Sequence, residues 1–106
     1  MRINQKRFYP GIVTFNDLNY LNLSQSLVQQ GCSLKEDLLH VKYPHNYLLD
    51  VGWYGSFLDP KKGFFRIVII KNNDWQKPKY KLIFKDINLL KINLLLTTQY
   101  LKRNFL

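Results

Sequence analysis

Hydrophobic and polar positions alternate most regularly in the second half of the chain, where three segments are predicted to be β-strands. Residues 47–54 alternate between apolar side chains on one side and mixed ones on the other. Residues 64–71 are β-branched and apolar on both sides, which predicts a strand inside a sheet. Residues 79–85 have period two, with rings and leucine on one side and lysines on the other. The connections between these segments are short, which favours antiparallel pairing.

The pattern is weaker before residue 47. Pro10 and Gly11 interrupt residues 8–15, so a strand there is short or lies at a sheet edge. Residues 38–43 fit either the end of a helix or the start of a strand. Clusters of turn-forming residues separate the segments and lie at 44–46, 55–63 and 72–74.

Helices are predicted before and after the strands. The first begins at a cap, Asn16 or Asp17, and ends at Gly31. Its stripe consists of Leu18, Leu21, Gln25 and Val28, with Leu27 beside it. Ser33 and Glu36 then have the spacing of a capping box, which predicts a further short turn of helix.

The last helix is predicted to run from about Ile87 to Arg103, with Asp86 as its cap. One face carries a stripe of large side chains, of the kind that an amphipathic helix packs against a core. This stripe consists of Leu89, Ile92, Leu96 and Tyr100.

Together these elements predict the α+β class. We expect a small antiparallel sheet of three to four strands, with the N-terminal and C-terminal helices packed on one face. When helices cover only one side of a sheet, the other face is exposed to solvent. The lysines of residues 79–85 would lie on that face. The chain has 106 residues, the size of one ordinary domain, so residues 1–106 are predicted to form a single domain.

Composition supports a folded protein of the cytoplasm. The chain is 46% hydrophobic and 15% aromatic, which is too apolar for a disordered tail. Cys32 is the only cysteine, so no intrachain disulfide is expected. The basic N-terminus is not followed by the apolar run of a signal peptide, and no run approaches the roughly 20 residues that span a bilayer. Neither secretion nor a membrane is therefore expected.

The net charge of +9 is unevenly distributed. Residues 1–60 hold five basic and five acidic side chains, whereas residues 61–106 hold eleven basic side chains and two acidic ones. Such asymmetry indicates a face that binds something acidic, whether nucleic acid, an anionic membrane or a protein surface. A surface that only keeps the chain soluble is the other interpretation.

Candidate catalytic and metal-binding residues are few. His40, His45 and Cys32 lack the spacing of a metal site, so no metal or other cofactor is expected. Ser56, His45 and Asp50 can be written as a triad, but Ser56 is not in a nucleophile elbow. An RNase-like site built on His40, His45 and lysines is the one enzyme alternative that stays open. We therefore expect a binding protein without catalytic residues or a small-molecule substrate.

Basic side chains interleaved with aromatic ones form the remaining signal. Lysines meet phosphates and rings stack on bases in nucleic-acid sites, but Trp and Arg are equally typical of protein interfaces. The predicted partner-binding residues are Arg66, Trp75, Lys77, Lys79, Lys81 and Lys85.

Three stretches resemble a known family. They are Leu49–Tyr54 with its Gly-Trp-Tyr, the aliphatic run Gly63–Ile70, and Asp74-Trp75 followed by Pro78. Over roughly residues 38–85 the chain is similar to the small immunity proteins of bacterial contact-dependent growth inhibition and related polymorphic-toxin systems. The resemblance implies a stoichiometric inhibitor that binds a cognate toxin domain, often a nuclease acting on tRNA, and blocks its active site or substrate path.

The positive charge restricts this hypothesis. Nuclease toxins tend to be basic because they hold RNA, so a basic inhibitor requires a toxin with an acidic surface or a binding site away from the substrate groove. Both options remain open. The alternative function is that of a small basic nucleic-acid-binding protein, whose affinity would fall steeply with salt.

Overall fold

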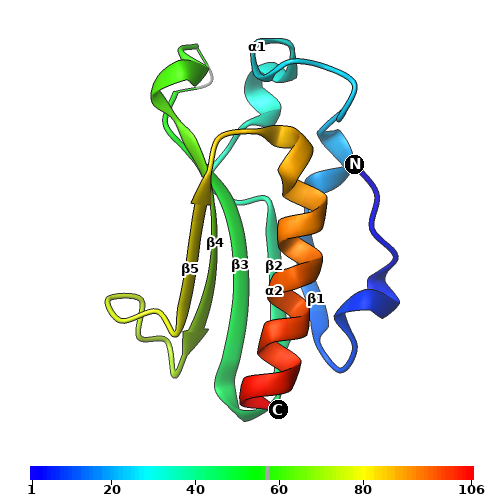
Figure 1. Cartoon of the computed structure of the whole chain (residues 1–106), viewed down its shortest axis with the longest axis vertical. Coiled ribbons are helices and arrows are strands. Elements are labelled where there is room, and N and C mark those ends of the chain that lie inside the picture. Colours follow the sequence, from blue (N-terminus) through cyan, green and yellow to red (C-terminus); the bar gives the residue numbers. More distant parts are fainter. Residues whose placement is uncertain (57) are drawn as a thin grey trace.

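Five strands form one antiparallel sheet in the computed structural model, which describes residues 1–56 and 58–106. The strands are β1 (Ile12–Asn16), β2 (Leu39–Tyr43), β3 (Tyr47–Tyr54), β4 (Phe64–Lys71) and β5 (Tyr80–Phe84). Their order in the sheet is their order in the chain (Figure 1). Two α-helices, α1 (Leu27–Gln30) and α2 (Leu90–Phe105), complete the fold. The predicted α+β class is confirmed, with five strands in place of three or four.

The strands β3 and β4 form the centre of the sheet and match the predicted segments residue for residue. They pair from Tyr47 opposite Lys71 to Tyr54 opposite Phe64. Alternation sends Leu49, Val51 and Trp53 of β3 to the core side, where all three are fully buried. Each of these strands is hydrogen-bonded on both sides, as the two-sided apolar pattern of β4 predicts.

Residues 38–43, which fitted a helix or a strand, form β2 and pair with β3. The interrupted segment 8–15 gives the short edge strand β1, whose register shifts between Val13 and Phe15. The tight turns at the ends of β2 and β4 use residues in the left-handed region, where Asn is tolerated. These residues are His45, Asn46, Asn72 and Asn73.

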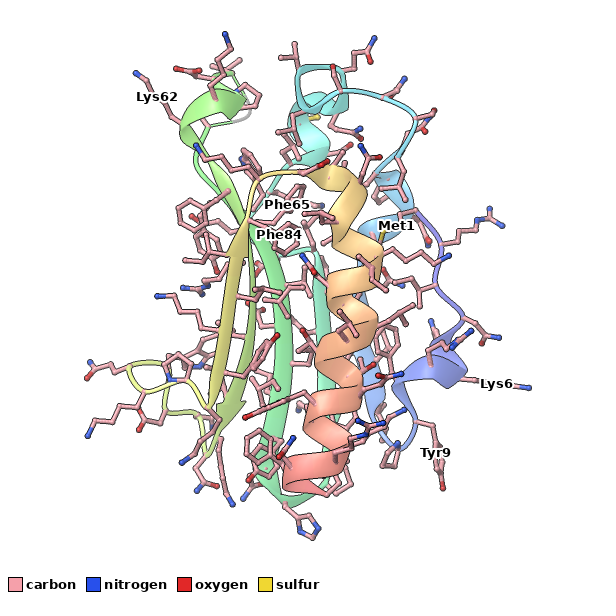
Figure 2. The ribbon with its side chains drawn as sticks, in the orientation of Figure 1. Met1, Lys6, Tyr9, Lys62, Phe65 and Phe84 are labelled. Atoms are coloured by element: carbon pink, nitrogen blue, oxygen red, sulfur yellow. The ribbon has the colours of Figure 1, made fainter. Side chains whose placement is uncertain are left out.

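One face of the sheet is covered by α2, which runs along it in Figure 1. Phe65 and Phe84 lie next to each other beside the first turn of this helix in Figure 2, and their ring centroids are 5.5 Å apart. Trp53 meets Phe65 edge-on, with centroids 4.9 Å apart. We call this side the core face of the sheet.

The prediction of a long N-terminal helix from residue 16 or 17 to residue 31 is wrong. Only Leu27–Gln30 is α-helical, after a 3₁₀ turn at Leu18–Tyr20, although Gly31 does end the helix as predicted. Polar side chains bond to nearby backbone instead: Asn22 Oδ1, for example, accepts from the Ser24 backbone N–H. Such local bonds compete with a continuous helix.

The capping box predicted at Ser33 and Glu36 is also wrong. The capping box lies at Ser26, whose side chain accepts from the Gln29 backbone N–H while the Gln29 side chain accepts from Ser26. Lys35 is part of an extended segment, and its carbonyl accepts from the Trp53 backbone N–H at 2.8 Å. Pairing with the end of β3 replaces the expected helical turn.

The last helix exists as predicted, but it turns a different side to the core. Asp86 caps the preceding 3₁₀ turn Ile87–Leu89 through the Asn88 backbone N–H. The side chains that α2 buries are Leu90, Leu94, Thr97, Thr98 and Leu101. The predicted stripe of Leu89, Ile92, Leu96 and Tyr100 is exposed.

The predicted loop at 55–63 joins β3 to β4 and contains a 3₁₀ turn at Pro60–Lys62. Residue 57 of this loop lies outside the described residues. No helix among the described residues is long and apolar enough to cross a membrane.

Candidate interaction face

The side of the sheet opposite α2 is the candidate functional site, and we call it the open face. The Glu36 carbonyl crosses its margin and leaves no room for a side chain at Gly52. Exposure varies over the rest of the face: Val68 and Ile70 are 1% exposed, whereas Lys42, Lys81 and Ile83 are exposed. The side chains that strand alternation places there are Ile12, Phe15, His40, Lys42, Leu48, Asp50, Tyr54, Phe64, Arg66, Val68, Ile70, Lys81 and Ile83.

Four of the six predicted partner-binding residues are brought to this face. Arg66 and Lys81 project from β4 and β5, while Lys79 and Lys85 flank β5 in the same alternation as Lys81. The three lysines are exposed. Lys85 also donates to the Lys61 carbonyl at 2.9 Å, which ties it to the loop before β4. The lysines therefore form a basic border along the β5 edge of the open face.

The other two predicted residues lie outside the sheet. Trp75 and Lys77 belong to the loop between β4 and β5, which extends away from the sheet at the lower left of Figure 1. Trp75 is 45% exposed, a large exposed fraction for an aromatic side chain. A hollow of about 330 Å³ in this region is lined by Lys71, Asn72, Asp74, Lys77 and Lys79. This loop continues the basic border beyond the end of β5.

Arg66 is held in place by an aromatic neighbour. Its guanidinium lies over the ring of Tyr54, 4.2 Å from the centroid, and one of its NH₂ groups donates to the Tyr54 hydroxyl at 2.7 Å. Tyr54 in turn stacks on Phe64, with centroids 5.9 Å apart. A cation over a ring is worth about 0.5–1 kcal/mol at an exposed site, so this contact favours the observed orientation of Arg66 in the free protein.

An acidic centre lies within this basic face. His40 of β2 and Asp50 of β3 are cross-strand partners, and the His40 Nε2 to Asp50 Oδ1 distance is 2.7 Å. Asp37 reaches the same nitrogen at 3.3 Å. The ring of Phe15 lies beside His40, with centroids 5.5 Å apart.

Asp50 is the buried member of this cluster, with 3% of its surface exposed. Burial raises the pKa of its carboxyl, and the neighbouring His40 and Arg66 oppose the rise. Burying a carboxylate costs free energy unless it is paired, and His40 supplies the pair.

The donor atoms of Asp37, His40 and Asp50 lie within 4.8 Å of one another, so the three side chains could hold a metal ion. Both carboxylates lie against the same imidazole nitrogen, Nε2 of His40, so the contacts within the cluster are those of an imidazole between two acids. Cys32, considered with the histidines in the sequence, lies outside this cluster in an exposed turn.

The catalytic combinations considered from the sequence are not assembled. His45 lies in the turn before β3 and Ser56 lies just past its other end, so about 25 Å of extended strand separates them. Asp50 bonds to His40 instead. The face offers fixed charges, rings and one imidazole–carboxylate pair, a set suited to recognition.

A polar hollow lies at the end of the sheet, between the β2–β3 and β4–β5 turns. Its volume is about 450 Å³, and its lining residues are Lys42, Tyr43, Asn46, Tyr47, Leu48, Asn72 and Asn73. The Asn72 backbone N–H donates to the Asn46 carbonyl at 3.0 Å, which joins the two turns. The hollow follows from how these turns pack and carries no charged cluster of its own.

Sequence reasoning missed part of the face. Phe15, His40 and Lys42 were not assigned to it because β1 and β2 were not firmly predicted. The alternation of Leu39, Val41 and Tyr43 with His40 and Lys42 was the available signal.

Comparison of the chain with protein-family models, with curated proteins and with solved structures gave no match.

Proposed function

We propose that this protein is an immunity protein, which binds a cognate toxin domain in a stoichiometric complex and blocks its active site or the access of its substrate. The observation that carries the proposal is the open face, where lysines border a platform that holds Arg66, Tyr54 and Phe64. The sequence motif of the chain also supports the proposal. Its residues Gly52, Trp53 and Trp75 are part of the stretches that resemble the immunity proteins of polymorphic-toxin systems.

The motif residues divide between folding and recognition. Trp53 is fully buried, and its indole ring occupies the space where a side chain at Gly63 would lie. These two residues therefore shape the β3–β4 hairpin. Trp75 and the lysines are exposed and are the residues left to contact a partner.

The face is suited to an acidic protein surface. Lys79, Lys81 and Lys85 would steer the encounter, since exposed charges act mainly on the association rate. Trp75 would anchor the complex, because a few desolvated aromatic and Arg side chains carry most of the energy of an interface. The half-buried rings of Tyr54 and Phe64 would lie under the partner beside Arg66.

The first experiment is co-expression with the product of the reading frame immediately upstream, with a tag on this protein alone. We expect a partner that copurifies in stoichiometric amount from nuclease-treated lysate and that is toxic when expressed by itself. A protein that instead carries RNA, or whose binding to oligonucleotides falls log-linearly with salt, would establish the nucleic-acid alternative.

Charge reversal then tests the face. The variant Lys79→Glu/Lys81→Glu/Lys85→Glu should slow association with the toxin on the order of tenfold or more at low salt. Its matched control is Arg2→Glu/Lys6→Glu/Lys91→Glu, which has the same net charge but changes exposed residues outside the open face. Equal effects of both variants would assign the loss to net charge and exclude the open face as the site.

Trp75→Ala tests the anchor separately. We expect it to lower affinity by about 2 kcal/mol, or roughly 30-fold, chiefly through faster dissociation. An unchanged dissociation rate in a folded variant would remove Trp75 from the interface.

A further inference from the structure

The helix α2 has a second apolar side that the sheet does not use. The side chains of this stripe are Leu89, Ile92, Leu96 and Tyr100, which are 44%, 49%, 52% and 40% exposed. Ile92, Leu96 and Tyr100 follow one another at a spacing of four residues along α2, and Leu89 precedes them at the end of the 3₁₀ turn. Single exposed apolar residues are ordinary, but a continuous line of four marks an interaction surface.

The stripe continues into the edge of the sheet. The ring of Tyr100 packs against that of Tyr80 on β5, with centroids 4.9 Å apart. Tyr80, Leu82 and Phe84 point to the core face but are only partly buried. The helix stripe therefore meets the edge strand β5 at Tyr100, on the side of the sheet opposite the open face.

Charges at the two ends of the stripe make it complementary to itself. Asp86 lies three residues before Leu89, and Arg103 lies three residues after Tyr100. Both are exposed, and Asp86 carries the only acidic side chain between Asp74 and the C-terminus. If two such helices lie antiparallel with their stripes in register, each Asp86 faces an Arg103 of the other copy.

We propose that the stripe is the interface of a homodimer, in which two copies pack their α2 helices antiparallel about a two-fold axis. Ile92 then faces Leu96 of the second copy, and Leu89 faces its Tyr100. The antiparallel helix dipoles and two Asp86–Arg103 pairs fix the direction of packing. The proposal does not depend on the toxin, because the open faces remain free on the outer sides of the dimer.

The interface is small, so the dimer is weak. Four half-exposed side chains per copy cover less than the roughly 800 Å² per partner of a standard interface. Two copies that each carry +9 also repel one another at low ionic strength. We expect a micromolar dissociation constant that falls as salt is added.

The first test is sedimentation equilibrium of the full chain from low to several hundred micromolar concentration in moderate salt. The wild type should dimerise, and Leu96→Asp should raise the dissociation constant at least tenfold. Val28→Asp is the matched control, since Val28 is a 70% exposed apolar residue on α1, and it should leave the dimer unchanged. Thermal denaturation checks that both variants are folded.

The second test uses the self-complementary charges. Asp86→Lys and Arg103→Glu should each weaken the homodimer, because in each variant both Asp86–Arg103 pairs become pairs of like charge. Asp86→Lys also removes the cap on the Asn88 backbone N–H, so thermal denaturation must show that both variants are folded. A mixture of the two variants should restore dimerisation, because every pair in the mixed dimer is then of opposite charge. This rescue would not occur if the residues acted only on the stability of the monomer.

Three outcomes would overturn the proposal. The wild type could remain monomeric throughout the concentration range, or a wild-type dimer could be unaffected by Leu96→Asp. In the third, Leu96→Asp weakens binding of the toxin while the free protein is monomeric, which assigns the stripe to the toxin. The proposed immunity function fails separately, through the absence of a toxic partner.

Discussion

At the scale of single residues, two polar side chains are buried at opposite faces of the sheet. Asp50 lies under the open face, where burial raises the pKa of its carboxyl. Tyr43 lies on the core face with its hydroxyl buried and without a hydrogen-bond partner among the described residues. Burial raises the pKa of the Tyr43 hydroxyl as well. Each therefore opposes the stability of the fold in a measurable way.

Asp50→Asn should change how stability depends on pH. Because the pKa of Asp50 is raised in the folded state, the folded protein binds a proton more readily than the unfolded chain. The free energy of unfolding should therefore fall as pH rises from the ordinary Asp value, near 3.8, through the raised pKa. Urea unfolding over a pH series should show this fall in the wild type and a flatter profile in the variant.

The exposed turn residue Asp74 supplies the control for that experiment. Asp74→Asn should keep the wild-type profile. If Asp50→Asn and the wild type gave parallel profiles, the carboxyl of Asp50 would not be the source of the pH dependence.

Tyr43→Phe should leave the free energy of unfolding unchanged or raise it by about 1 kcal/mol. The variant removes a buried hydroxyl that has no partner and keeps the ring in the core. Urea denaturation measures the effect. A loss of stability greater than about 1 kcal/mol would show that the hydroxyl has a partner in solution, such as an ordered water.

At the scale of elements, α2 decides which side chains form the core. It is apolar on two sides, one against the sheet and one exposed. Leu94→Ala should lower the free energy of unfolding by about 2–5 kcal/mol, because it opens a cavity in the core. Leu96→Ala, two residues away, should change it by less than about 0.5 kcal/mol at concentrations where the protein is monomeric.

Leu94 and Leu96 also show what the sequence could and could not predict. The strands at 47–54 and 64–71 were predicted to the residue, because alternation and turn residues mark both ends. The side of the last helix could not be predicted, because Leu90, Leu94 and Leu101 form an apolar stripe as good as the exposed one. Periodicity identifies a helix with two such stripes, but only packing decides between them. If Leu96→Ala were the more destabilising variant, the exposed side would be the core side.

The part of the candidate site that was predictable is the part that depends on single strands. Lys79, Lys81 and Lys85 share a face by alternation alone. The pairing of His40 with Asp50 depends on the register of β2 against β3, which a single sequence does not contain.

At the scale of the whole molecule, the sheet separates two surfaces of different chemistry. The open face is basic. The surface formed by α2 and β5 is apolar, with the negative charge of Asp86 at one end and the positive charge of Arg103 at the other. Their responses to salt should therefore have opposite signs.

Raising salt from about 50 to 500 mM should slow association with the toxin while changing its dissociation little. The same change should strengthen dimerisation, because it screens the repulsion between two copies that each carry +9. Binding kinetics on an immobilised toxin and sedimentation equilibrium measure the two effects. Responses of the same sign would mean that one surface serves both associations.

The strand order β1-β2-β3-β4-β5 has a consequence for how the chain reaches this structure. Every strand pairs with its neighbour in sequence, so the sheet can grow by adding one hairpin at a time, a low-contact-order route that favours fast folding. The helix α2 follows all five strands and is made after them on the ribosome. The core face of the newly made sheet, with Val51, Trp53 and Phe65, therefore lacks the cover of α2 until that helix emerges, and in that interval the nascent chain is most exposed to chaperones and to aggregation.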